Sequence, residues 1–163
     1  MILAVTNQKG GIGKTTTCLN LGAIAALDGK RTCLIDLDPQ GNLTKTFIHL
    51  QEGQPTIYNI LNYAAPFPEV LVETSIKGLS LIPARSDLAG LERSGASDSK
   101  LPYRLQQALT SNITDFDLII IDTPPTLGAL TINAMTAATH ILIPIQPSYY
   151  PLQGTSDLIE TAN

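Results

Sequence analysis

The chain is poor in aromatic residues, cysteine and charge. Its 163 residues include no tryptophan, 5% aromatic residues and 15% charged residues. This low charge, together with a hydrophobic content of 44%, excludes an intrinsically disordered chain, which needs high charge and little apolar content. The net charge of −4 gives no general attraction for nucleic acid, although a local basic patch can outweigh the sum over the whole chain.

Long apolar runs and cysteine clusters are absent as well. No apolar run approaches the roughly 18 residues of a membrane span, and polar residues 9–17 stand where a signal peptide would need its apolar core. Cys18 and Cys33 form no C-x-x-C pair and no metal-ligand spacing, so we interpret both as small buried hydrophobic residues. The length fits one domain over residues 1–163. We expect a cytoplasmic protein that has no membrane partner.

A glycine-rich loop is the most informative stretch. It follows the apolar run 2–5, precedes a segment with helical spacing, and reads Lys9-Gly10-Gly11-Ile12-Gly13-Lys14-Thr15-Thr16. Strand, glycine loop and helix in this order are typical of a phosphate-binding loop, because backbone N–H groups and the positive end of the helix dipole face one anion.

The loop departs from the usual Walker pattern, which asks for glycine at position 8, where Gln8 stands. It is instead the variant with an extra lysine, Lys9, ahead of the glycines. We predict that Lys14 contacts the β- and γ-phosphates of a purine triphosphate and that the Thr15 hydroxyl binds Mg²⁺. The alternative is a glycine turn that caps an ordinary helix.

Apolar strands alternate with helical segments along the chain. We predict strands over 2–6, 32–36, 79–82, 117–122 and 141–145, with a hairpin turn at 77–78. Helices are predicted over 14–28, 57–61 (capped by Thr56), 86–91 (capped by Ser86), 103–112 and 130–138. We also predict a short helix capped by Asn42 or Thr44, a loop over 93–100 and a further helix near Gln153. This alternation predicts a three-layer α/β fold with a mostly parallel twisted sheet.

Three aspartates follow the predicted strands. Asp36 and Asp122 end two of them, and Asp38 lies two residues beyond the first. Ligands of open parallel sheets bind beyond the carboxyl ends of the strands, so we expect these carboxylates near the glycine loop.

Each aspartate has a predicted role and a plainer alternative. We expect Asp122 to hold Mg²⁺ through a bound water, as in a Walker B element, and Asp36 to lie on the metal side as a further residue of the metal site. Asp38 is expected to align an attacking water. The alternatives are a strand-end turn residue for Asp122 and a cap of the turn at 39–41 for Asp38. His49 and His140 have no partner pattern and are interpreted as surface or packed residues.

Three motifs in this order, N-Q-K-G-G-I-G-K-T-T, D-L-D-P-Q-G-N and I-D-T-P-P, resemble the ParA/Soj-type partition ATPases. These belong with MinD and nitrogenase iron protein to the deviant-Walker class of P-loop proteins. The resemblance continues through 82–84, 130–134, 144–147 and 149–154. It implies a P-loop NTPase fold, ATP and Mg²⁺ as cofactors and slow ATP hydrolysis. By motif position, Lys9 is similar to the lysine that reaches the partner's ATP in a nucleotide-sandwich dimer, and Thr16 to a phosphate contact.

The resemblance also implies partners. In this family an ATP-bound homodimer binds DNA without sequence preference, and a ParB-like activator stimulates hydrolysis, so we expect association with the nucleoid in the ATP-bound state. Family members usually continue into further strands and helices, which supply adenine contacts and many DNA-binding basic residues. We therefore expect C-terminal truncation or a shortened relative.

Other functions of this fold stay open. A MinD-like positioning ATPase would need a C-terminal amphipathic helix, which is not visible, and a nitrogenase-type reductase would need cluster-binding cysteines. A small-molecule kinase or ligase and a non-hydrolysing ATP-gated scaffold are the remaining alternatives.

Overall fold

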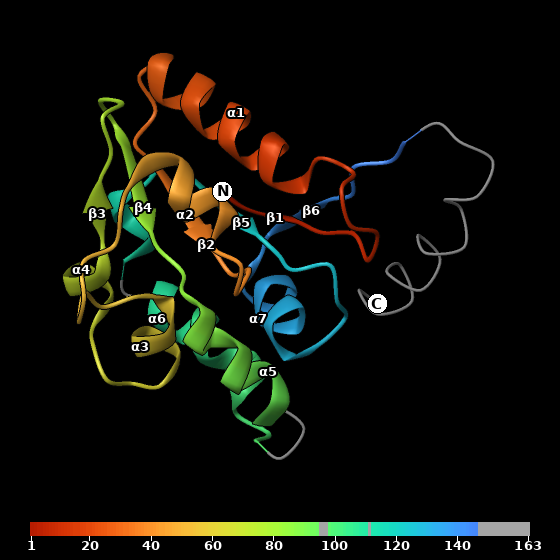
Figure 1. Cartoon of the computed structure of the whole chain (residues 1–163). Helices are drawn as coiled ribbons and strands as arrows, with labels where there is room; N and C mark the ends of the chain where they lie inside the picture. The colour runs from red at the N-terminus through yellow and green to blue at the C-terminus, as the bar shows by residue number, and fades with distance from the viewer. Residues whose placement is uncertain (95–97, 111, 147–163) are drawn as a thin grey trace.

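The computed structural model describes residues 1–94, 98–110 and 112–146 (Figure 1). Within them, six strands form one sheet in the order β3-β4-β2-β5-β1-β6. The strands are β1 (Ile2–Val5), β2 (Thr32–Asp36), β3 (Val72–Glu73), β4 (Leu79–Ile82), β5 (Leu118–Asp122) and β6 (His140–Leu142). Neighbouring strands are parallel except for the antiparallel pair β3–β4, which is the predicted hairpin.

Helices cover both faces of this sheet. They are α1 (Lys14–Leu27), α2 (Asn42–Phe47), α3 (Ile57–Leu61), α4 (Phe67–Val70), α5 (Ala89–Ser94), α6 (Arg104–Thr110) and α7 (Ala129–Ala137). Figure 1 shows α1 and α2 on one face of the sheet and α3, α5, α6 and α7 on the other. The predicted three-layer α/β fold with a mostly parallel sheet is confirmed. No helix in the described part of the chain is long and apolar enough to cross a membrane.

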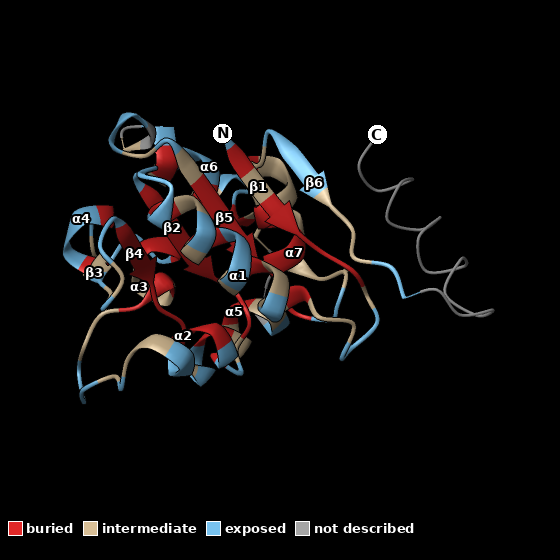
Figure 2. Cartoon of the chain, turned by 90° about the horizontal axis from the view of Figure 1, so that it is seen from above, coloured by how far each residue is buried: buried red, intermediate tan, exposed pale blue. Residues whose placement is uncertain are grey.

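Two hydrophobic clusters hold the layers together. Ile119 and Ile121 of β5 pack into the cluster that contains Leu130 of α7, whereas Ile120 packs into the cluster that contains Cys18 of α1. Successive side chains of a strand point to opposite faces, so an all-apolar strand requires cover on both sides. Figure 2 shows the resulting band of buried central strands.

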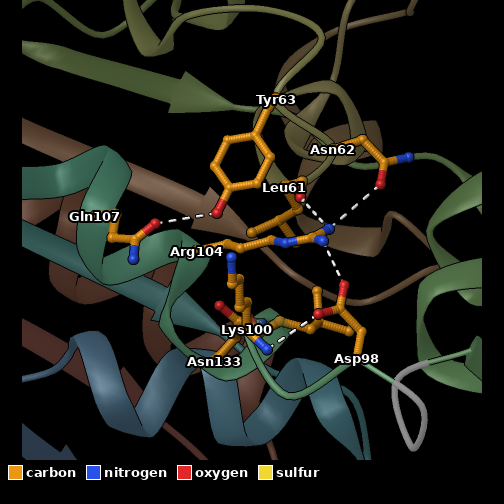
Figure 3. A network of polar contacts seen from close by, with 9 residues as sticks. Leu61, Asn62, Tyr63, Asp98, Lys100, Arg104, Gln107 and Asn133 are labelled. Carbon is orange, nitrogen blue, oxygen red and sulfur yellow. Dashed lines mark hydrogen bonds and ion pairs between the residues drawn. The ribbon is translucent and has the colours of Figure 1, made fainter.

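The helix layer opposite α1 is tied together by polar contacts around Arg104 (Figure 3). Its guanidinium lies 5.0 Å from the centre of the Tyr63 ring, donates from Nη1 to Leu61 O at 2.7 Å, and forms an ion pair with Asp98. Tyr63 Oη donates to Gln107 Oε1 at 3.0 Å. These contacts join the end of α3 to the start of α6.

Three predicted helix starts can be compared with the structure. Thr56 caps α3 as predicted, and Asn59 Oδ1 accepts from its backbone N at 2.9 Å. The helix at 42 is capped by Gly41, not by Asn42 or Thr44, because the Thr44 side chain bonds to other groups described below. The helix expected from Ser86 starts as a 3₁₀ turn, Ser86–Leu88, capped by Arg85 rather than by Ser86.

The last predicted strand is present but ends earlier than expected. Its expected range of 141–145 is replaced by β6, which ends at Leu142. Pro144 has no N–H for a strand ladder, and its carbonyl accepts instead from Asn7 Nδ2 at 3.0 Å. Residues 95–97 of the expected loop, the motif at 149–154 and the helix expected near Gln153 lie outside the described residues.

Candidate functional site

The loop between β1 and α1 adopts a conformation that only glycine readily supplies. Gly11 has φ +72° and Gly13, which caps α1, has φ +91°. A Cβ at either position would meet nothing within 4 Å, so these glycines serve the backbone conformation rather than close packing. The loop thus opens directly onto the N-terminus of the 14-residue helix α1, an arrangement that favours an anion.

Asn7 fixes the entrance of this loop. Its Oδ1 accepts from Lys9 N at 3.0 Å, and its Nδ2 donates to Pro144 O at 3.0 Å. The glycine loop is therefore tied to the segment that follows β6. The sequence pattern does not distinguish Asn7 from the other residues of the first motif.

The two lysines of the loop lie in different environments. Lys14 is 7% exposed, and its Nζ donates to Lys9 O at 3.2 Å. Burial lowers the pKa of Lys14, while the neighbouring Asp122 and Asp38 carboxylates act in the opposite direction. Lys9 is exposed, with its Nζ 3.4 Å from Gln146 Oε1. Lys14 thus faces the interior of the site, and Lys9 is accessible from outside.

Thr15 and Asp122 meet at the base of the loop. Thr15 Oγ1 donates to Asp122 Oδ2 at 2.7 Å. Within the described residues, Asp122 Oδ1 is buried and has no hydrogen-bond partner. Burial is the main cause that raises the pKa of Asp122 to about 7, and the nearby Asp36 and Asp38 add to it.

A divalent cation would relieve this unfavourable burial. The unpaired carboxylate oxygen and the adjacent hydroxyl are hard oxygen donors of the kind that Mg²⁺ prefers. No group of three or more His, Cys, Asp and Glu side chains in the described ranges is arranged to hold a metal ion. A cation here would therefore need further oxygen ligands from a phosphate or from water.

Asp36 anchors the loop that follows β2. Its Oδ2 accepts from Thr44 N at 2.8 Å and from Thr44 Oγ1 at 2.7 Å, and its Oδ1 accepts from Asp38 N at 3.0 Å. Thr44 Oγ1 in turn accepts from Ala84 N at 2.9 Å, just beyond β4. Burial raises the pKa of Asp36 to about 6, against the hydrogen bonds from Thr44. The sequence pattern indicates Thr44 only as a possible helix cap and carries no sign of this contact.

Asp38 caps a turn next to the glycine loop. Its Oδ1 accepts from Gln40 N at 2.9 Å, and its carbonyl accepts from Gly41 N at 2.8 Å. The turn contact considered as an alternative from the sequence is thus present. Asp38 is also 9% exposed and close enough to Lys14 to affect the pKa of that lysine.

The three motifs come together at the carboxyl edge of the sheet. Asp36 pairs in register with Asp122, and Leu37 N donates to Asp122 O at 2.9 Å. Thr123 Oγ1 donates to Val5 O at 2.9 Å, which joins the third motif to the start of the glycine loop. This is the edge where open parallel sheets bind ligands.

The remaining candidate residues keep the places expected for them. Cys18 and Cys33 are buried and unpaired with each other, as interpreted from the sequence. His140 is exposed at the start of β6, and His49 is exposed beyond α2. Neither histidine lies among the motif residues just described.

A mostly parallel sheet with a glycine loop between its first strand and first helix defines a P-loop nucleotide-binding domain. A family model described as AAA domain matches residues 1–163, and the chain belongs to this family. The resemblance to the ParA/Soj-type partition ATPases is confirmed by the relatives that the chain matches.

Two relatives bear partition names. The chain is 45% identical to the sporulation initiation inhibitor protein Soj of Bacillus subtilis over 98% of its own length and 64% of that protein. It is 42% identical to the chromosome partitioning protein ParA of Caulobacter vibrioides, over 98% and 61% of the two chains. The chain therefore spans somewhat less than two thirds of the length of these relatives.

Two solved structures share the fold. Cobyrinic acid a,c-diamide synthase from Mycobacterium smegmatis, with bound ATP analog and magnesium, superposes with a TM-score of 0.91 at 40% identity, over 99% of this chain and 66% of that one. Apo McdA of Cyanothece superposes with a TM-score of 0.93 at 27% identity, over 99% and 64%.

Proposed function

We propose that this chain is the nucleotide-binding domain of an ATP-driven switch that partitions DNA. The single observation that carries the proposal is the Thr15–Asp122 hydrogen bond at 2.7 Å beneath a glycine loop whose Gly11 and Gly13 have positive φ. The match to Soj and ParA supports partition as the process that the switch serves.

The glycine loop binds the triphosphate in this proposal. Backbone N–H groups of residues 10–16 and the α1 N-terminus face the phosphate oxygens, and Thr16 adds a side-chain contact. Lys14 supplies a positive charge to the β- and γ-phosphates from its buried position. The structure solved with an ATP analog and magnesium supports ATP as the nucleotide.

Thr15 and Asp122 would hold Mg²⁺, and Asp36 fixes the loop beside them. When bound, Mg²⁺ neutralises charge on the phosphate oxygens. Asp38 aligns the attacking water from the turn that it caps. The exposed Lys9 delivers its charge to the nucleotide of a second copy, so that efficient hydrolysis requires a homodimer.

The partners of the switch follow from the partition names of the relatives. The ATP-bound dimer binds DNA without sequence preference, and a ParB-like activator raises the slow rate of hydrolysis and releases the dimer. DNA affinity should fall with salt, since contacts to phosphates release counterions. The protein is then cytoplasmic and associates with the nucleoid only when ATP is bound.

Sedimentation of the full chain tests the proposal, with ATP, ADP or no nucleotide and with or without nonspecific DNA. We expect a dimer with ATP alone, and co-sedimentation of that dimer with DNA. A monomer in all three nucleotide states would overturn the switch.

One solved neighbour, the cobyrinic acid a,c-diamide synthase, favours a small-molecule enzyme as a second candidate. ADP production that depends on an added small-molecule substrate, and not on DNA or on protein concentration, would support that candidate instead.

A further inference from the structure

A cationic hollow lies beside the turn that carries Asp38. Its volume is about 350 Å³. It is lined by the turn before α2, by α2 itself, by the segment after α2 and by the segment that follows β4. Three of the side chains that line it are basic, those of Lys45, His49 and Arg85, and none of the lining residues is acidic. A cluster of three basic side chains is unexpected in a chain with a net charge of −4.

The two strong cations of the hollow are not neutralised by the described residues. Lys45 Nζ donates to Gln40 O at 2.6 Å, and Arg85 Nη2 donates to Gln51 O at 2.8 Å. The ion pairs within the described ranges join other residues. Two positive charges whose partners are neutral carbonyl groups attract an anion, and a concave site strengthens that attraction.

The hollow also has an apolar wall, which distinguishes between anions. Ile48, Leu50 and Ala84 line it together with the basic groups. A nucleic-acid backbone offers phosphates but no aliphatic groups to fill such a wall. A peptide that carries both carboxylates and aliphatic side chains matches the charge and the apolar surface together.

We propose that this hollow binds an acidic, partly aliphatic peptide segment of a partner protein. The proposal rests on the proposed switch for its consequence, because the hollow is connected to Asp38 by two hydrogen bonds. Lys45 Nζ donates to Gln40 O, and Gln40 N donates to Asp38 Oδ1. A bound carboxylate that competes for Lys45 therefore acts on the turn that positions Asp38.

Fluorescence anisotropy with the full chain tests this site. The probe is a short labelled peptide that alternates Asp or Glu with Leu. Its comparison ligands are the same peptide with Asn and Gln in place of the acids, and single-stranded oligo-dT. We expect the acidic peptide to bind, the amide peptide to bind at least about tenfold more weakly, and binding to weaken as salt is raised.

Charge-reversal variants locate the binding. Lys45→Glu and Arg85→Glu should each weaken peptide binding at least about tenfold. Lys77→Glu should leave it unchanged, since Lys77 is exposed at the β3–β4 turn, outside the hollow. Equal loss in Lys77→Glu, equal binding of the amide peptide, tighter binding of oligo-dT or no peptide binding would each overturn the proposal.

Nucleotide binding, measured beside peptide binding, separates this proposal from the proposed function. Binding of a fluorescent ATP analogue by Lys45→Glu and Arg85→Glu, with wild-type affinity, shows that both variants are folded. A wild-type chain that binds nucleotide but not the peptide refutes the hollow alone. A chain that binds the peptide but not nucleotide refutes the switch and leaves the hollow.

In the wild type, the amide NMR signal of Gln40 should shift on peptide addition, and an unchanged signal would refute the connection to Asp38.

Discussion

Thr15 and Asp122 are joined by a hydrogen bond of 2.7 Å although they lie 107 positions apart in the chain. The parallel pairing of β1 with β5 places Val5 in register with Asp122, so the loop after β1 returns Thr15 to the same point. The hydroxyl fixes one carboxylate oxygen and leaves the other buried without a partner among the described residues. In the proposed function, this unpaired oxygen and the Thr15 hydroxyl are the groups that would hold Mg²⁺.

Replacing Asp122 by Asn should reduce nucleotide affinity only when Mg²⁺ is present. The amide keeps the size of the side chain but removes the negative charge, so we expect a loss of roughly ten- to a hundredfold with Mg²⁺ and little change in EDTA. Titration with a fluorescent ATP analogue measures both. Asp117→Asn is the control, since Asp117 pairs with Arg31 at the surface. Equal losses with and without Mg²⁺ would contradict the assignment.

The burial of Asp122 also predicts how stability depends on pH in metal-free protein. Its folded-state pKa of about 7 exceeds the ordinary value of 3.8, so the folded state binds the proton more tightly than the unfolded state. The free energy of unfolding should therefore fall as pH rises from about 4 to about 7. Asp122→Asn should flatten this slope and raise stability at pH 8 by roughly 1 to 3 kcal/mol. Urea unfolding in EDTA at several pH values measures the slope, and an unchanged slope in the variant would refute this explanation.

The sequence predicted the parts of the fold that depend on local pattern. All-apolar runs such as 118–121 require cover on both faces, and the glycine loop indicated a backbone conformation that residues with a Cβ resist, so both features were recognisable. The contacts of Thr44 were not, because its hydrogen bonds to Asp36 and to Ala84 N join segments whose approach depends on tertiary structure. The early end of the strand expected at 141–145 has a similar cause, because the Asn7 side chain donates to the Pro144 carbonyl beyond Leu142.

A methyl group at Gly22 should destabilise the fold. A Cβ there would lie 2.7 Å from Leu34 Cδ2, where α1 packs on β2. Alanine favours a helix by about 1 kcal/mol over glycine, but overpacking costs about 1 to 3 kcal/mol, so we expect a net loss. Gly90→Ala in α5 is the matched control, because a Cβ there meets nothing within 4 Å. Thermal unfolding compares the two, and a stabilised Gly22→Ala would show that Leu34 adapts without strain.

Lys9→Ala should separate nucleotide binding from hydrolysis. Lys9 is exposed, while the buried Lys14 stays in place, so the affinity for ATP should change little. The hydrolysis rate should no longer depend on protein concentration and should fall by roughly a thousandfold, because the variant lacks the positive charge that one copy supplies to the nucleotide of the other. Lys30→Ala, an exposed lysine after α1, is the control. Normal turnover by Lys9→Ala would refute the role in trans.

Two substitutions of Asp38 distinguish its chemical role from its turn cap. Asn retains an oxygen that can accept from Gln40 N, as Asp38 Oδ1 does at 2.9 Å, whereas Ala removes both the charge and the hydrogen bond. If Asp38 orients the attacking water, both variants should bind ATP, form the dimer and lose at least about a hundredfold in hydrolysis rate. Only Ala should lower the free energy of unfolding, by about 1 kcal/mol. Phosphate release, sedimentation and urea unfolding measure these effects, with Asp28→Ala at the exposed end of α1 as the control. Full hydrolysis by Asp38→Asn together with a defect in Asp38→Ala would assign Asp38 to the turn alone.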